Sequence, residues 1–128
     1  MVVLAGFQPM HLEDVLDLCR QQRWPTFPSN PDRALHALLA PGTVTVVAVA
    51  HGELIGFAHA MTATGTTYLA QLLVSPARRG QGIGCALISD VFRRCGTERF
   101  DVLTNTAEGF YAGIPHRRYR GFRLCLGW

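Results

Sequence analysis

A run of arginines and glycines in the middle of the chain has the residue types that bind phosphate. An apolar stretch ends at Val74, and the loop behind it reads Arg-Arg-Gly-Gln-Gly-Ile-Gly from Arg78 to Gly84, where an apolar-periodic segment begins. Glycines let an anion approach the backbone, and the free N–H groups and dipole of a helix N-terminus favour negative charge. The spacing therefore predicts an anion site between a buried strand and a helix.

Two familiar phosphate sites do not match this loop. The sequence contains no lysine, which excludes a Walker-type loop and a Schiff-base lysine. A dinucleotide site would need glycines spaced G-x-G-x-x-G and an acidic residue about 20 positions later, at the end of the next strand. Here the spacing is G-x-G-x-G, and Asp101 stands at the start of the next expected strand. A plain strand-to-helix connection remains the alternative without a ligand.

Three short motifs in the second half of the chain resemble those of one known family. They are Arg79-x-x-Gly82-x-Gly84, Ala107-x-x-Phe110-Tyr111 and Gly121-Phe122. The first is similar to the pyrophosphate loop of the GNAT family of acyl-CoA-dependent N-acetyltransferases, and the others resemble that family's short helix and closing strand. The resemblance implies transfer of an acetyl group from acetyl-CoA to a primary amine by direct attack in a ternary complex.

The resemblance also implies which residues contact acetyl-CoA, the co-substrate. The cofactor is expected in a V-shaped opening between the strands 68–74 and 100–103, with Tyr111 near the thioester sulfur as the catalytic acid. The cofactor-binding residues implied are Leu72, Leu73, Val74, Arg78, Arg79, Gly80, Gln81, Gly82, Ile83, Gly84, Asn105 and Tyr111. No metal is implied.

The chain departs from the family pattern in three places. Thr104 stands where the family often has asparagine, with Asn105 one position later, and the stretch from Tyr111 to Gly121 is longer than usual. That stretch makes Tyr119 a second candidate for the acid. No carboxylate occurs between Glu53 and Asp90, so His59 or solvent is left as the base.

The hydrophobic pattern around these motifs predicts an α+β domain with a mixed, mostly antiparallel sheet flanked by helices. Strands are expected at 2–7, 43–50, 54–63, 68–74, 100–103 and 119–126, with 68–74 central because it is apolar on both faces. The first helix begins near Met10 and ends at Trp24-Pro25; further helices are expected at 31–39, 83–95 and 107–111.

Length and composition limit the class of protein. With 128 residues and 48% hydrophobic residues, the chain is expected to form a single domain over 1–128. No apolar stretch is long enough to cross a membrane and no secretory signal is visible, so a cytoplasmic location is expected. The four cysteines lack metal-ligand spacing and are expected to be small buried side chains.

The expected partner is a small-molecule or protein amine, and a homodimer is left open. A net charge of +3 argues against bulk nucleic-acid binding. The arginines around Tyr119 and Phe122 are compatible either with a solvated edge or with an RNA contact. The alternative function is a non-catalytic module of the same fold that binds CoA or RNA.

Overall fold

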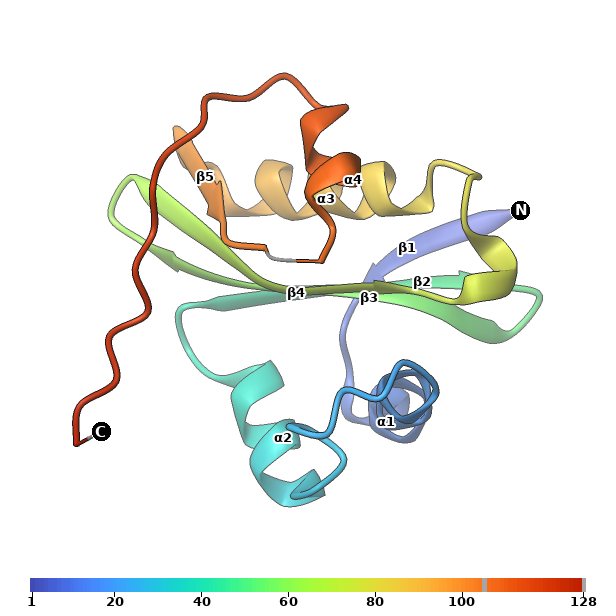
Figure 1. Cartoon of the computed structure of the whole chain (residues 1–128). Helices are drawn as coiled ribbons and strands as arrows, with labels where there is room; N and C mark the ends of the chain where they lie inside the picture. The colour runs from blue at the N-terminus through green and yellow to red at the C-terminus, as the bar shows by residue number, and fades with distance from the viewer. Residues whose placement is uncertain (105, 128) are drawn as a thin grey trace.

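The structure, a computed structural model, describes residues 1–104 and 106–127, and its helices and strands follow the expected order as far as α4 (Figure 1). The strands are β1 (Val2–Gly6), β2 (Thr43–Ala50), β3 (Glu53–Ala63), β4 (Thr66–Val74) and β5 (Arg99–Val102). The helices are α1 (Leu12–Gln21), α2 (Pro31–Leu39), α3 (Ile83–Cys95) and α4 (Glu108–Ala112), with 3-10 turns η1 (Pro9–His11) and η2 (Pro76–Arg78).

Within the described residues, the strands form one five-stranded sheet in the order β1-β2-β3-β4-β5. Neighbouring strands are antiparallel except β4 and β5, which are parallel. The β2–β3 hairpin turns at His51 and Gly52, whose φ angles of 52° and 77° are typical of a type I′ turn. The predicted α+β class with a mostly antiparallel sheet is confirmed.

Helices cover both faces of the sheet: α1 and α2 pack on one face, and α3 packs on the other with α4 beside it (Figure 1). Because successive strand residues point to opposite faces, the interior strands supply two cores. Val47 and Phe57 belong to the α1–α2 core, whereas Ala58 packs with Leu87 of α3. A sheet buried on both faces explains why only 16% of the residues are charged.

The β4 strand differs from the central strand that the sequence predicts. It pairs with β3 along its length, from Ala63↔Thr66 to Gly56↔Val74, but its parallel register with β5 stops at Leu69↔Val102. The β3–β4 register also shifts between His59 and Ala60, so that Ala70 forms a bulge. Beyond the bulge, β4 continues to Val74 while β5 has ended, which leaves an opening at the β5 side of β4.

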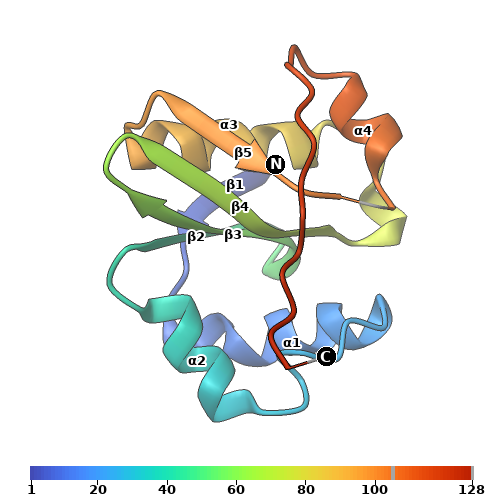
Figure 2. The same cartoon turned by 60° about the vertical axis from the view of Figure 1, so that its left-hand side comes forward.

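The predicted last strand, 119–126, is wrong. The described part of this segment, through residue 126, has no strand assignment and is largely exposed, and it runs from α4 past the end of β5 to the level of the α1–α2 layer (Figures 1 and 2). It touches the domain at Gly121, where an added Cβ would lie 2.6 Å from Leu103 Cδ2. A strand here would need a long free edge, and β5 offers only four residues.

The expectation of buried cysteines holds for one of the four. Cys19 is buried on α1, and burial raises the pKa of its thiol to about 11. Cys85 is exposed, and Cys95 and Cys125 are half-buried. Cys19 lies on the buried, apolar face of α1, whereas Cys85 lies on the exposed side of the first turn of α3.

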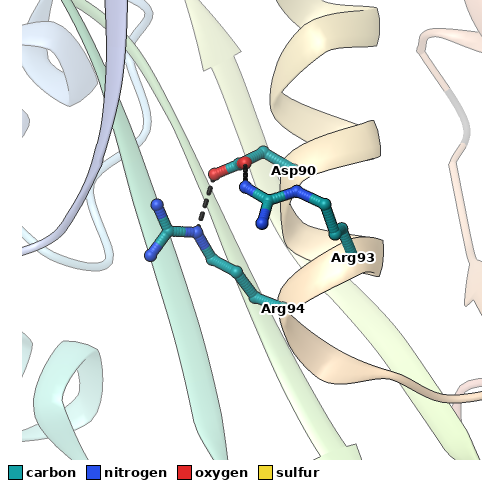
Figure 3. A network of polar contacts seen from close by, with 3 residues as sticks. All are labelled: Asp90, Arg93 and Arg94. Atoms are coloured by element: carbon teal, nitrogen blue, oxygen red, sulfur yellow. Dashed lines mark hydrogen bonds and ion pairs between the residues drawn. The ribbon is translucent and has the colours of Figure 1, made fainter.

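A buried carboxylate anchors the C-terminal half of α3 (Figure 3). Asp90 is only 8% exposed and binds Arg93 and Arg94, with 2.7 Å between Arg94 Nε and Asp90 Oδ2. Burial alone would raise the pKa of Asp90, but the hydrogen bonds and charges of the two arginines outweigh it and lower the pKa. The carboxylate is therefore ionised at neutral pH.

Replacing Asp90 by alanine is expected to lower the free energy of unfolding by about 1–3 kcal/mol, because Arg94 would stay partly buried without its partner. Arg93→Ala is the matched control: its side chain is 71% exposed, so its loss should cost less than about 1 kcal/mol. Urea unfolding of both variants measures the difference. Equal losses would contradict this account of the network.

Candidate active site

The glycine loop joins the end of β4 to the start of α3 and exposes backbone at that point. Gly80 and Gly82 have φ angles of 78° and 79°, and Gly82 is the N-cap of α3. A Cβ added at Gly82 would meet no other atom within 4 Å. The first helical bond runs from Ala86 N–H to the Gly82 carbonyl, 3.0 Å, so the preceding amides of the first turn are left for a ligand.

The arginines of the loop fasten it to the domain. Arg79 donates from Nε to the Val74 carbonyl at 3.4 Å and from Nη2 to Gln22 Oε1 at 2.6 Å. Arg79 therefore ties the loop to the end of β4 and to the end of α1. Arg78 donates from Nη1 to Gln81 Oε1 at 3.4 Å, within the loop itself.

The structure brings the predicted cofactor residues into one region. Leu72, Leu73 and Val74 form the end of β4 at the opening beside β5, and the loop and first turn of α3 follow directly. The predicted contact Asn105 lies outside the described residues. Its neighbour Thr104 has a structural role, because its Oγ1 accepts hydrogen bonds from Ala107 N–H at 2.9 Å and Thr106 N–H at 3.3 Å.

Gly84 has a packing role that the motif did not indicate. A Cβ at this position would lie 3.1 Å from the ring of Phe110, so the missing side chain lets α4 pack closely on the first turn of α3. Phe110 and Tyr111 also contact each other edge to face, with 4.9 Å between ring centroids. Gly84 thereby fixes where α4 holds Tyr111.

The two candidate acids lie in different environments. Tyr111 is half-buried against the α3 core, and burial raises the pKa of its phenol, which stays protonated at neutral pH. Tyr119 is 75% exposed on the C-terminal segment, and its hydroxyl lies 3.5 Å from Arg117 Nη1. Only Tyr111 packs against the core on the same face as α3.

Glu108, on the first turn of α4, is paired with the C-terminal segment. Arg118 Nη1 lies 2.5 Å from Glu108 Oε1, and both side chains are exposed. The hydrogen bond and charge of Arg118 lower the pKa of Glu108. This carboxylate is thus engaged with an arginine next to the candidate acid Tyr111.

His59 is buried on the opposite, α1–α2 face of the sheet. Its Nδ1 lies 2.8 Å from Thr45 Oγ1, which also bonds the Leu38 carbonyl of α2 at 3.1 Å. Phe27 lies edge-on to the imidazole, 6.1 Å between centroids. Burial lowers the pKa of His59 below its ordinary 6.5, so the ring is neutral at pH 7 and keeps one basic nitrogen.

The lowered pKa of His59 predicts a loss of stability in mild acid. Well above pH 6.5, His59 is neutral in both the folded and the unfolded protein. Below pH 6.5, His59 binds a proton in the unfolded chain, while burial disfavours the same protonation in the folded protein. The free energy of unfolding therefore falls as the pH falls. The His59→Gln variant is the control, because glutamine does not bind a proton in this pH range. The wild type should therefore lose up to about 1.4 kcal/mol more than the variant between pH 8 and 5.5 by urea unfolding. Parallel stability curves would contradict the prediction.

Gln71 lies in this region but belongs to none of the sequence motifs. It is the cross-strand partner of His59, and its Oε1 is buried with no hydrogen-bond partner in the described structure. The available signal was a single amide within the apolar strand TTYLAQLLV. A strand pattern predicts such a side chain to be buried or exposed, but not whether its polar atoms are paired.

Residues 1–104 and 106–127 contain neither a metal-binding cluster nor a helix able to span a membrane. No group of three or more histidine, cysteine, aspartate or glutamate side chains there could hold a metal ion. None of the helices in those ranges combines the length and the apolar character needed to cross a membrane.

The family follows from a comparison with protein-family models. The model of the acetyltransferase (GNAT) domain matches residues 41–114, more than half of the chain. The matched region contains the β4 opening, the glycine loop, α3 and α4. The chain therefore belongs to the GNAT acetyltransferase family. Among curated protein sequences, none matches it.

Solved structures show the same fold at low sequence identity. The aminoglycoside N-acetyltransferase AAC(6')-Iy, solved with a CoA bisubstrate analogue, is 22% identical, with 98% of this chain and 99% of that chain covered and a TM-score of 0.75. An acetyltransferase of Trypanosoma brucei is 23% identical, with 98% of this chain and 100% of that chain covered and a TM-score of 0.75. A ribosomal-protein-alanine N-acetyltransferase of Brucella melitensis is 16% identical, covering 97% of each, TM-score 0.79.

Proposed function

We propose that this protein is an acetyl-CoA-dependent N-acetyltransferase that transfers the acetyl group to a primary amine by direct attack in a ternary complex. The observation that carries the proposal is the opening beside β4 that leads into the glycine loop. The backbone of Leu72–Val74 does not pair with β5 there, and a Cβ added at Gly82 would have no atom within 4 Å. An extended chain ending in a pyrophosphate fits such a path.

Each part of the site has a role in this proposal. The amides from Arg79 to Gly84 hold the pyrophosphate, because a helix N-terminus offers free donors and a favourable dipole. Backbone of Leu72–Val74 pairs with the pantetheine arm. Tyr111 protonates the thiolate that leaves when the amine attacks the thioester carbonyl.

Deprotonation of the amine needs no carboxylate on β4 in this proposal. The strand TTYLAQLLV carries none, so the attacking amine is neutral and loses its proton to solvent or, through water, to His59. The neutral ring of His59 is able to accept that proton.

The proposed acceptor is a small-molecule or protein amine. Similar structures include an aminoglycoside N-acetyltransferase and a ribosomal-protein-alanine N-acetyltransferase, so a small-molecule amine and a protein amine are the two candidate acceptor classes. Both classes belong in the test. We further propose a cytoplasmic location, where acetyl-CoA is available to the enzyme.

Release of free CoA thiol tests the proposal. Purified protein is incubated with acetyl-CoA and, one at a time, an aminoglycoside, a polyamine, an amino acid and a peptide with a free N-terminal alanine. A thiol-reactive chromophore reports CoA, and a protein-only blank corrects for the exposed Cys85. Thiol release that depends on one of these amines is the expected result.

The absence of a carboxylate on β4 supports a second candidate, a non-catalytic module that binds CoA or RNA. Calorimetric titration separates the two. Binding of acetyl-CoA without thiol release from any amine of the panel would favour the module and contradict the enzyme. Binding of an RNA oligonucleotide in place of acetyl-CoA would contradict the assignment of the glycine loop as well.

A further inference from the structure

Two polar side chains face each other on the α1–α2 side of the sheet, where most neighbours are apolar. His59 and Gln71 are cross-strand partners in the β3–β4 register. His59 shares its face with Phe57, and Gln71 shares its face with Leu73; both of these belong to the α1–α2 core. Directly opposed residues have Cβ atoms about 4.5–5.5 Å apart, so the amide and the imidazole are neighbours.

The carbonyl oxygen of Gln71 lacks a donor. Its Oε1 is buried and has no hydrogen-bond partner in the described structure. Leaving a buried acceptor unpaired costs about 1–3 kcal/mol, and native proteins rarely do so without a reason. A ligand that brings a donor would recover this cost on binding.

The hydrogen bonds around His59 support one assignment of its ring proton. The hydroxyl of Thr45 has one proton, and it donates this proton to the Leu38 carbonyl. With that proton on the Leu38 carbonyl, we assign Thr45 Oγ1 as the acceptor from His59 and the proton of the neutral ring to Nδ1. Nε2 then carries the lone pair. Gln71 Oε1 and His59 Nε2 are thus two acceptors carried by directly opposed residues of β3 and β4.

A pair of acceptors requires a group with at least two N–H or O–H donors. A primary amine has two such donors on one nitrogen, and a tertiary amine in its neutral form has none. The opening between β4 and β5 lies next to Gln71, since pairing of the two strands stops at Leu69↔Val102. A nitrogen held at this pair would be close to the path proposed for the thioester.

We propose that Gln71 and His59 together form the subsite that binds and orients the nitrogen of a primary amine acceptor, with Gln71 Oε1 and His59 Nε2 each accepting one N–H. This inference rests on the proposed N-acetyltransferase function and specifies its acceptor. Gln71 is a specificity-determining residue in this arrangement, because it favours primary over tertiary amines. The subsite carries no formal charge, which suits a neutral nucleophile.

Nitrogen NMR of the histidine ring tests the subsite without requiring turnover. The probes are n-butylamine and, as the tertiary control, N,N-dimethylbutylamine, added at a pH that keeps a neutral fraction. In the wild type, n-butylamine is expected to shift the His59 Nε2 resonance while Nδ1 remains protonated, and the tertiary amine to leave it unchanged. The Gln71→Met variant should lose most of this response.

Stability and kinetics of Gln71→Met provide two further readouts. Since its Oε1 is unpaired, the methionine variant should unfold at the same or a higher urea concentration, as should the control Gln21→Met on the exposed side of α1. With an amine found by thiol release, KM for that amine should rise about three- to tenfold in Gln71→Met, as expected for one lost hydrogen bond. The affinity for acetyl-CoA should not change.

The outcomes separate this inference from the proposed function. An active enzyme whose Gln71→Met variant keeps the wild-type KM for the amine overturns the subsite and leaves the function intact. A shift of Nε2 by n-butylamine in a protein that never releases CoA overturns the function and supports the subsite. No shift in the wild type means that the pair holds only water, which overturns the subsite.

Discussion

The Tyr111→Phe variant is expected to bind acetyl-CoA with wild-type affinity and to lose on the order of 10²-fold in kcat. The change removes one hydroxyl and keeps the ring, which packs half-buried against the α3 core. A phenol with a raised pKa holds its proton at neutral pH, so it can donate that proton to the leaving thiolate. Calorimetry measures the affinity and steady-state thiol release measures kcat.

Tyr119→Phe is the matched control for this prediction. Tyr119 is exposed on the C-terminal segment and its hydroxyl lies near Arg117, so kcat should stay close to the wild-type value. If Tyr119→Phe shows the loss and Tyr111→Phe turns over normally, the acid is Tyr119. The C-terminal segment would then have to move over the site when substrates bind.

The Gly82→Val variant is expected to bind acetyl-CoA at least about tenfold more weakly, which corresponds to about 1.4 kcal/mol. A side chain here meets no protein atom, so it would fill the space proposed for the pyrophosphate. The positive φ of 79° adds backbone strain. Calorimetric titration of acetyl-CoA into folded variant measures the affinity.

Gly65→Val separates strain from steric exclusion. Gly65 lies in the β3–β4 turn, has a φ angle of 74° and, like Gly82, would place a Cβ in open space. The two substitutions should therefore destabilise the fold to a similar degree, and circular dichroism checks that both variants are folded. Only Gly82→Val should weaken acetyl-CoA binding; equal affinities would show that the loop is not the pyrophosphate site.

Local signals in the sequence were sufficient for most of the elements. Asn30 is a preferred N-cap residue followed by Pro31, and its Oδ1 caps α2 by accepting from Arg33 N–H at 3.2 Å. His51 and Gly52 form the turn of the β2–β3 hairpin, and both residues have positive φ. Capping and tight turns depend on a few adjacent residues, so a single sequence contains the information they need.

The C-terminal segment shows where local signals fail. Its alternation of aromatic, apolar and basic residues is typical of a strand, but a strand forms only against a partner of sufficient length. The length of β5 depends on how the whole sheet pairs, and β5 ends at Val102 after only four residues. Likewise, the apolar run of β4 predicted burial on both faces, but not that its pairing with β5 would stop at Leu69.

The sequence by itself determined the family, the glycine loop at the start of α3 and a short list of candidate side chains, because these depend on residue type and short spacing. Only the tertiary structure decided how those side chains are placed. Gly84 admits the ring of Phe110 and so positions Tyr111, while the β3–β4 register sets Gln71 beside His59. Both placements join segments distant in the chain, and such contacts depend on packing across the whole domain.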